Sequence, residues 1–431
     1  MNLLEKLFVA SAFAASVACA ISAQAQSLTS SQGLTLRQAE ERLLANNRDI
    51  LAARRAVEAS QANTLSAGAR PNPTLSLGLS SINPSAGIGS GTLRDKTVDT
   101  SVRVDQVFER GNRRELRIEL AKSLESASAG DLDEVIRQRR LALRFAYYDL
   151  AVAQDRSGVL AETAALFTRS VEAAQKRFAA GDISAADVSR IRVDALRAES
   201  DARFADAERR RAQVALALIT GSELETGTIS ARDPWPALSD VPAAAAQPLD
   251  TDALERRPDV RAARRRLDSA QKARELARSL RTRDFSVGAQ YDRYPSSGSN
   301  TLGTGNSFGV FVSVPLFVNY AFDGEIRRAE VDYSAAEEAL ARLVAEARAE
   351  GQRTLGDLHA ASDRLRRYDQ TLAEAMRSAS AAEFAYANGA MGVMDLLDAR
   401  RTLRAIQIES VNARAEHARA WAAWRAVTGD F

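Results

Sequence analysis

The segment RFAAGDISAADVSRIR, from Arg177 to Arg192, returns later in the chain as AYANGAMGVMDLLDAR, from Ala385 to Arg400. In both copies a glycine and an aspartate recur at the same places, and both copies run on without a gap to a Thr-Gly pair. The spacing of about 210 residues is far longer than the roughly 20–50 residues of a solenoid repeat. The pattern therefore predicts an internal duplication, in which two halves share one architecture.

The position of the proline residues separates helical from non-helical chain. All ten prolines lie at 71, 73, 84, 234, 236, 242, 248, 258, 295 and 315. The two long proline-free stretches carry apolar residues every seven positions, which is the period of a coiled-coil seam. They predict a helix from about Asn112 to Ala179, followed by a second helix after the Gly181 turn. Because these seams are rich in alanine, such helices need neighbours on several sides, as in a sheet or tube of helices.

The duplication and the prolines together suggest a domain organisation. We expect a first structural repeat at residues 26–233, a linker at 234–250 and a second repeat at 251–431. The proline-rich linker separates two repeats that each contain long helices and one pair of strands.

The first 25 residues have the features of a secretory signal peptide. Lys6 precedes an apolar run from Leu7 to Ala20, and Ala23-Gln24-Ala25 has the small-x-small pattern of a cleavage site. The mature chain is expected to begin near Gln26. Cys19, the single cysteine, is expected to be lost with this leader, the alternative being lipidation at a poor lipobox. No later apolar run is long enough to predict a membrane-spanning helix.

The composition excludes several classes of function. Charged residues make up 26% of the chain, but the formal net charge is only +2, which lacks the clustered basic excess of nucleic-acid binding. No catalytic constellation is recognisable, so the chain is predicted not to be an enzyme and to carry no cofactor. One cysteine and two separated histidines, His359 and His417, do not supply the ligands that soft or borderline metals prefer. His417 occupies a seam position equivalent to Arg209, which favours packing or hydrogen bonding over metal ligation.

Four short segments alternate apolar and polar side chains, as β-strands with two different faces do. In VDTSVRVDQVF, from Val98 to Phe108, valines alternate with aspartate, serine and arginine. Three further segments follow the same rule, and they predict one β-hairpin in each half, at about 74–108 and 285–316. The hairpin loops are rich in glycine and serine, which is typical of the long external loops of outer-membrane barrels.

Four strands per chain cannot close a transmembrane barrel, whose smallest versions have about eight. An open sheet edge is not viable in lipid, so several chains would have to pool their strands. Two chains would give a barrel filled by side chains, whereas three would give about twelve strands and a lumen. The residues expected to face lipid are Val98, Val102, Val104, Val310 and Val312.

The run RRPDVRAA, from Arg256 to Ala263, follows the linker. Through this run and the features described above, residues 35 to 429 resemble the TolC-like outer-membrane efflux factors, in which this run is common. Several segments are similar to its CzcC-type heavy-metal branch, among them RPNP from Arg70, QVFERGNRRELRIELA from Gln106 and YANGAMGVMDLLDARRTLR from Tyr386.

This resemblance implies a fold, a location and partners. Family members are homotrimers with a β-barrel in the outer membrane, continued by a long α-helical coiled-coil barrel across the periplasm. The implied fold class is mainly α with membrane β, in which the strands of three chains complete a barrel of about 12 strands. The implied function is the outer-membrane channel of a tripartite efflux system, coupled by a periplasmic membrane-fusion adaptor to an inner-membrane RND-type pump. The branch implies metal cations such as Co²⁺, Zn²⁺, Cd²⁺ or Cu⁺ as cargo, which a partner rather than this chain would select.

The two glycine turns are the implied contact points for the adaptor. Each turn would join two long helices into an αα-hairpin whose tip, by the resemblance, lies at the periplasmic entrance. Small residues let another helical tip approach the backbone closely. The tip residues expected to receive the adaptor are Gly181, Ile183, Gly389 and Gly392.

Asp395 and Asp398 are the residues implied at the channel entrance. They are three positions apart and share one helix face. The family places such aspartates around the constricted entrance, where three chains would form a carboxylate ring that attracts cations. A simpler alternative is that they are solvated carboxylates near a helix start, favoured by the helix dipole. Drug-export relatives carry a gate-locking arginine four residues earlier, where this chain has Met391, so closure by that ion pair is not expected.

Two other functions remain open on the sequence. The same duct would serve for drug efflux or type I protein secretion. A soluble periplasmic coiled-coil scaffold or adaptor is a third possibility, against which the four alternating strands weigh.

Overall fold

The computed structural model describes residues 33–80, 82, 98–222, 229–241, 251–294 and 305–429. They form two compact units. The tip unit comprises the described parts of Met1–Ile50, Ile136–Pro248 and Gly351–Phe431, and the sheet unit those of Leu51–Val135 and Leu249–Glu350. Each unit takes segments from both halves of the chain. The predicted leader with Cys19 and most of both hairpin loops lie outside the described residues.

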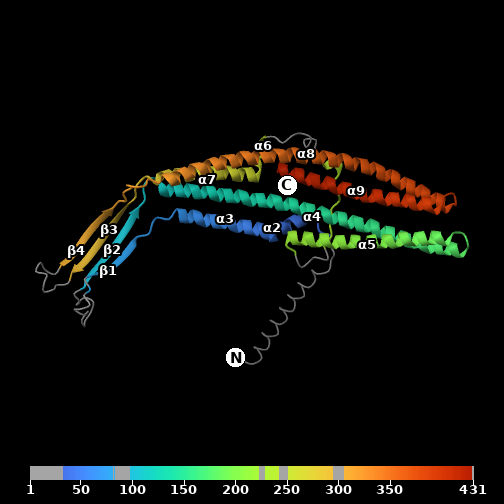
Figure 1. Cartoon of the computed structure of the whole chain (residues 1–431), viewed down its shortest axis with the longest axis horizontal. Coiled ribbons are helices and arrows are strands. Elements are labelled where there is room, and N and C mark those ends of the chain that lie inside the picture. The colour runs from blue at the N-terminus through green and yellow to red at the C-terminus, as the bar shows by residue number, and fades with distance from the viewer. Residues whose placement is uncertain are drawn as a thin grey trace, which may run out of the picture. The chain divides into compact units, whose positions relative to one another are not determined.

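The sheet unit holds a four-stranded antiparallel sheet in the order β1-β2-β3-β4 (Figure 1). Its strands are β1 (Thr74–Ser80), β2 (Asp99–Phe108), β3 (Phe285–Tyr294) and β4 (Gly305–Ser313). The register places Leu77, Val102, Tyr291 and Phe308 in one row across the sheet. Both predicted hairpins are confirmed, and the pairing of β2 with β3 joins the two halves of the chain in a single sheet.

Helices complete the sheet unit. They are most of α3 (Arg48–Ala67), α6 (Thr251–Arg256), α7 (Pro258–Ser279) and the N-terminal parts of α4 (Arg113–Ala179) and α8 (Asp323–Ala387). Pro258 is the first residue of α7, where a helix needs no N–H. The buried Arg257 before it contacts Asp259 and Glu350 at 2.8 and 2.7 Å. The RRPDV run therefore fixes the start of α7 against α8.

The tip unit is built from long helices. It contains α2 (Leu36–Asn46), α5 (Ala185–Thr220), the short 3₁₀ turn η5 (Leu238–Asp240), α9 (Val393–Thr428) and the C-terminal parts of α4 and α8. The predicted long helix is confirmed, since α4 has 67 residues and therefore extends about 100 Å. The second half repeats these lengths, with 65 residues in α8 and 36 in each of α5 and α9. None of the described helices is both long and apolar enough to cross a membrane.

The repeated Thr-Gly pairs are the ends of α5 and α9. The hydroxyls of Thr220 and Thr428 donate to carbonyls three and four residues earlier. The following glycines have positive φ angles, 68° at Gly221 and 83° at Gly429, as the left-handed cap of a helix requires. The two halves therefore share their helix ends as well as their helix lengths, as the predicted duplication requires.

Tyr147 of α4 ties the chain before α2 to the chain after α5 within the tip unit. Its buried hydroxyl donates to the carbonyl of Leu34 at 2.9 Å and accepts from the N–H groups of Arg232 and Asp233 at 3.0 Å. Burial raises the pKa of Tyr147 to about 12, so the phenol remains protonated and able to donate. This contact holds the chain where the predicted linker begins.

Candidate functional site: the hairpin tips and the sheet faces

The two glycine turns at the ends of α4 and α8 have the same geometry (Figure 1). Gly181 has a φ of 85° and Gly389 a φ of 72°, both in the left-handed region that favours glycine. In each turn the residue after glycine donates its N–H to a carbonyl five residues earlier at 2.9 Å, as in the Schellman motif. A Cβ added at either glycine would meet no atom within 4 Å. The backbone conformation therefore requires these glycines, and the space beside them is open within the described chain.

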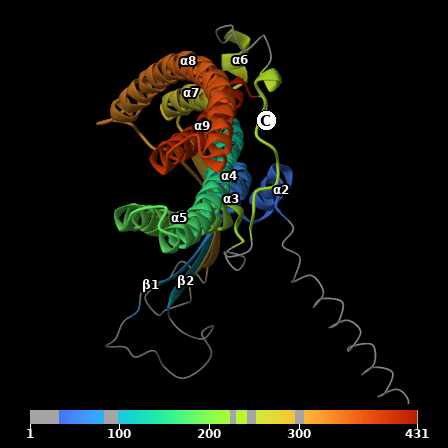
Figure 2. The ribbon, with the colours of Figure 1, turned by 90° about the vertical axis from the view of Figure 1, so that its right-hand side faces the viewer.

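Three of the four predicted docking residues are exposed at these turns, namely Gly181, Gly389 and Gly392. Ile183 is only partly exposed because it packs on a buried cluster beneath the tips. The buried members of this cluster come from α4, α5 and α9 and are Phe167, Ala174, Val188, Ile191, Ala198 and Leu397. A cavity of about 320 Å³ adjoins the cluster and is lined by residues of both hairpins. In the tip unit the two hairpins therefore contact one another just below their turns; Figure 2 looks towards the end at which these turns lie.

Asp395 and Asp398 are exposed on the first turns of α9. A Cβ at Gly392, the residue that caps this helix, would lie 3.4 Å from Oδ2 of Asp395. In the first copy, Ser184 takes the capping place: its hydroxyl donates to Asp187 at 2.7 Å and accepts the N–H of Asp187 at 3.2 Å. Glycine replaces this serine in the second copy. Asp395 consequently makes no side-chain hydrogen bond or ion pair within the described chain, and its charge faces solvent.

Ion pairs between α5 and α9 join the two hairpins. Arg401 contacts Asp194 at 2.5 Å, and Arg404 contacts Asp201 one heptad further along α5. These four residues were not predicted as a site from the sequence. The seven-residue spacing of the two aspartates was the available signal, but it does not reveal which helix supplies the arginines.

The sheet has one apolar and one polar face. Val102 and Val104 of β2 lie on the same face as Val310 and Val312 of β4, and Val98 just before β2 continues the alternation. Val310 is 79% exposed, whereas Val98 and Val102 are partly exposed. The other exposed apolar residues of this face are Leu75, Leu77, Leu79, Phe108 and Phe308. Within the described residues, this face is therefore apolar and largely exposed.

The polar face carries an ion pair. Arg103 donates two hydrogen bonds to Asp105, both at 2.7 Å. Its guanidinium also lies 4.7 Å from the centre of the Phe311 ring, a cation–π contact. Phe311 is not among the residues predicted from the alternation; between Val310 and Val312, it lies on the polar face beside Arg103.

His417 of α9 is fully buried, and neither ring nitrogen has a hydrogen-bond partner in the described chain. Burial lowers the pKa of His417, and the charge of Asp240 opposes that shift. The predicted packing role therefore holds, while the hydrogen-bonding alternative finds no partner. The described residues contain no cluster of three or more His, Cys, Asp or Glu side chains that would hold a metal ion.

Duplicated long helical hairpins joined to an antiparallel sheet with an uncovered apolar face define a class of outer-membrane channels. A family model described as outer membrane efflux protein matches residues 40–222 and 249–430. The chain belongs to this outer membrane efflux protein family. The predicted family, the mainly helical fold with a small sheet, the outer-membrane location and the absence of an enzymatic role agree with this membership. It also sets aside the alternative of a soluble periplasmic scaffold.

Similarities to individual proteins and solved structures agree with this family membership. The chain is 24% identical over 375 residues to the cobalt-zinc-cadmium resistance protein CzcC of Cupriavidus metallidurans, covering 86% of this chain and 84% of that protein. Its fold resembles that of the outer-membrane channel OprN, with a TM-score of 0.73 and 22% identity over 92% of this chain and 90% of OprN. The fold of CusC, for which a structural study describes transmembrane channel formation, gives a TM-score of 0.73 and 18% identity over 91% of both chains.

Proposed function

We propose that this protein is the outer-membrane duct of a tripartite system that exports heavy-metal cations. The observation that carries the proposal is the similarity to a protein named for cobalt, zinc and cadmium resistance, which spans 86% of this chain and 84% of that relative. In this proposal a membrane-fusion adaptor docks at the hairpin tips, and an RND-type pump in the inner membrane supplies the energy.

The sheet supports a trimer. In one chain β1 and β4 are the edges of the four-stranded sheet. Their unpaired backbone groups need partners in lipid, which an edge-to-edge pairing of β4 with β1 of the next copy supplies. Three copies give about twelve strands, enough for a lumen. The apolar face with Val310 and Val312 then faces lipid, and the face with Arg103 and Asp105 lines the lumen.

The exposed carboxylates at the tips suit a cation path. Three copies of Asp395 and Asp398 would surround the entrance and attract cations in their common field. The pairs of Arg401 with Asp194 and Arg404 with Asp201 are suited to hold the two hairpins together when the entrance is closed. They place arginines at other positions than the lock of the drug-export relatives, whose arginine corresponds to Met391 here.

The cargo is tested with a deletion strain. Its growth is compared with that of the parent on Co²⁺, Zn²⁺, Cd²⁺ and copper and on a panel of organic drugs, with the gene restored on a plasmid as control. Sensitivity to one or more metals, rescued by the plasmid, is expected. Sensitivity confined to drugs would refute metal cargo and favour the drug-efflux alternative.

A further inference from the structure

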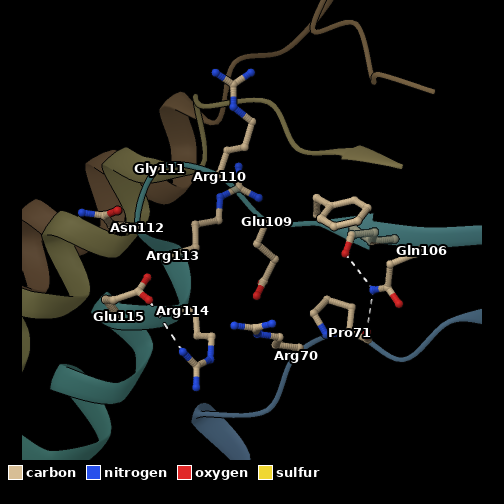
Figure 3. A pocket seen from close by; sticks show the side chains of 12 residues that line it. Arg70, Pro71, Gln106, Glu109, Arg110, Gly111, Asn112, Arg113, Arg114 and Glu115 are labelled. Atoms are coloured by element: carbon tan, nitrogen blue, oxygen red, sulfur yellow. Dashed lines mark hydrogen bonds and ion pairs between the residues drawn. The ribbon is translucent and has the colours of Figure 1, made fainter. Parts of the chain in front are cut away.

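A pocket of about 610 Å³ lies where the sheet meets the helices of the sheet unit (Figure 3). It is bounded by the segment that follows α3, by the end of β2 and by the start of α4. Its polar lining is dominated by arginine, namely Arg70, Arg110, Arg113 and Arg114. Two acidic residues, Glu109 and Glu115, also line it.

Ion pairs within the sheet unit neutralise most of these charges. Arg113 contacts Asp284 at 2.5 Å. Glu109 is bound by Arg117, with one nitrogen–oxygen distance of 2.9 Å, and the Arg117 hydrogen bond holds the pKa of Glu109 below its ordinary value. Glu109 is thus ionised and balanced by its own cation, and it does not act as an unpaired negative charge in the pocket.

Arg70 and Arg110 supply the remaining positive charge, because Glu115 offsets the charge of Arg114. The side chains of Arg70 and Arg110 make no ion pair or hydrogen bond within the described chain. Arg114 donates to the carbonyl of Gly68 at 2.7 Å and forms an ion pair with Glu115 at 3.7 Å. In Figure 3, Arg70 and Arg114 lie on the same side of the pocket, whereas Arg110 extends in the opposite direction. The pocket therefore keeps a net positive potential from Arg70 and Arg110, and the Arg114 guanidinium lies beside Arg70.

The pocket is continuous with the apolar face of the sheet. Phe108, which lines it, stacks on Phe285 with ring centres 5.2 Å apart and remains 46% exposed. The connection from β4 to α8 leaves the sheet at the same end and exposes Leu316 and Val318 at 71% and 81%. Cationic side chains beside exposed apolar and aromatic ones are typical of the boundary between lipid tails and headgroups.

We propose that this pocket binds the phosphate of an anionic phospholipid in the periplasmic leaflet of the outer membrane. Arg70 and Arg114 would contact the phosphate oxygens, since a guanidinium matches phosphate geometry with paired N–H donors. Phe108 would contact the glycerol and the upper part of the acyl chains. A free phosphate ion would use the arginines but gain nothing from the exposed rings. The inference rests on the outer-membrane location of the family and is independent of the cargo.

The test uses the full-length protein, purified in detergent and stripped of lipid. Native mass spectrometry measures the retention of phosphatidylglycerol and of phosphatidylcholine with the same acyl chains, and a parallel titration uses inorganic phosphate. Arg70→Gln is the main variant because Arg70 holds no contact in the described fold that its loss would break. Arg197→Gln, which removes an equally unpaired exposed arginine from α5, is the matched control.

The wild type and Arg197→Gln are expected to retain phosphatidylglycerol in preference to phosphatidylcholine. Arg70→Gln should bind phosphatidylglycerol about tenfold more weakly, as expected for the loss of a charge-assisted hydrogen bond. Equal retention of both lipids by the wild type would overturn the proposal without reference to any variant. Unchanged binding by Arg70→Gln, or binding of inorganic phosphate as tight as that of the lipid, would overturn it too.

Discussion

His417 offers a sharp test of the interior of the tip unit. Its imidazole is fully buried, and neither nitrogen finds a hydrogen-bond partner in the described chain. A buried polar group without a partner costs about 1–3 kcal/mol. Leucine is apolar and of similar size, so His417→Leu should raise the free energy of unfolding by about 1–3 kcal/mol at pH 7.5. His359→Leu is the matched control, because His359 is exposed on α8 and its loss should change stability little.

The pH dependence of this effect has a definite sign. Burial lowers the pKa of His417 in the folded protein below its ordinary value of 6.5. The unfolded chain therefore binds a proton at a higher pH than the folded one. The contribution of neutral His417 to the free energy of unfolding is fully present above pH 6.5. It is lost as the pH falls from there towards the folded pKa, by at most about 1.4 kcal/mol per pH unit. The advantage of His417→Leu over the wild type should therefore grow between pH 7.5 and 5.5, by at most about 1.4 kcal/mol, because only the unit below pH 6.5 contributes.

Urea unfolding of the detergent-solubilised protein, followed by tryptophan fluorescence, measures this difference. Trp421 and Trp424 follow His417 on the same helix and report on its surroundings. Comparing the variant with the wild type at each pH cancels the titration of the carboxylates that the two proteins share. A variant less stable than the wild type at pH 7.5, or a difference that does not change with pH, would show that His417 is hydrogen-bonded and refute the reasoning.

Three further predictions concern the proposed functional surfaces. Val102→Arg should destabilise the membrane-inserted sheet by about 2–4 kcal/mol and impair outer-membrane assembly. The control Ser101→Arg, on the other face of the sheet, should assemble normally. Equal amounts of both variants in extracted outer membranes would count against the prediction that Val102 faces lipid. Gly389→Trp should abolish metal resistance with the trimer intact on heat-sensitive gels, whereas Gly389→Asn should keep it because asparagine tolerates the left-handed conformation; resistance in both would place docking elsewhere. The double variant Asp395→Asn and Asp398→Asn should conduct in planar bilayers with weakened cation preference and unchanged thermal stability, and unaltered selectivity would return these residues to the role of solvated helix-start charges.

The sequence contains most of the secondary structure because that information is local. The seven-residue apolar period and the absence of proline specify α4 and α8 almost to their ends, and the glycine turns mark where each helix stops. Strict alternation likewise specifies the four strands and their two faces. Alternation places Val102 on the apolar side of β2 and Val310 on the apolar side of β4, and the register shows that the two sides form one face.

Contacts between segments that lie far apart in the chain could not be predicted from local sequence patterns. The pairing of β2 with β3 depends on bringing the two halves together, and no local pattern encodes it. The arginine-lined pocket of the sheet unit combines Arg70 with Arg114. These residues lie before and after the first hairpin in the sequence, so only the folded chain shows that they share a pocket. The missing hydrogen-bond partners of His417 could not be foreseen either, because a seam position indicates burial but not the polarity of its neighbours.

The duplication also shows where the two copies have diverged. Helix lengths, glycine turns and Thr-Gly ends are shared, as a common structural requirement demands. The copies differ at the residue that caps the second helix of each hairpin. This residue is Ser184 before α5 and Gly392 before α9. Serine engages the following aspartate Asp187 in the cap, whereas glycine leaves Asp395 without a partner in the described chain. Glycine is itself a tolerated cap and costs only a few tenths of a kcal/mol relative to serine, so the exchange frees the Asp395 carboxylate with little loss of helix stability. Under the proposed function, Asp395 is therefore free to act on a cation at the entrance, whereas Asp187 of the first copy is engaged in its helix cap.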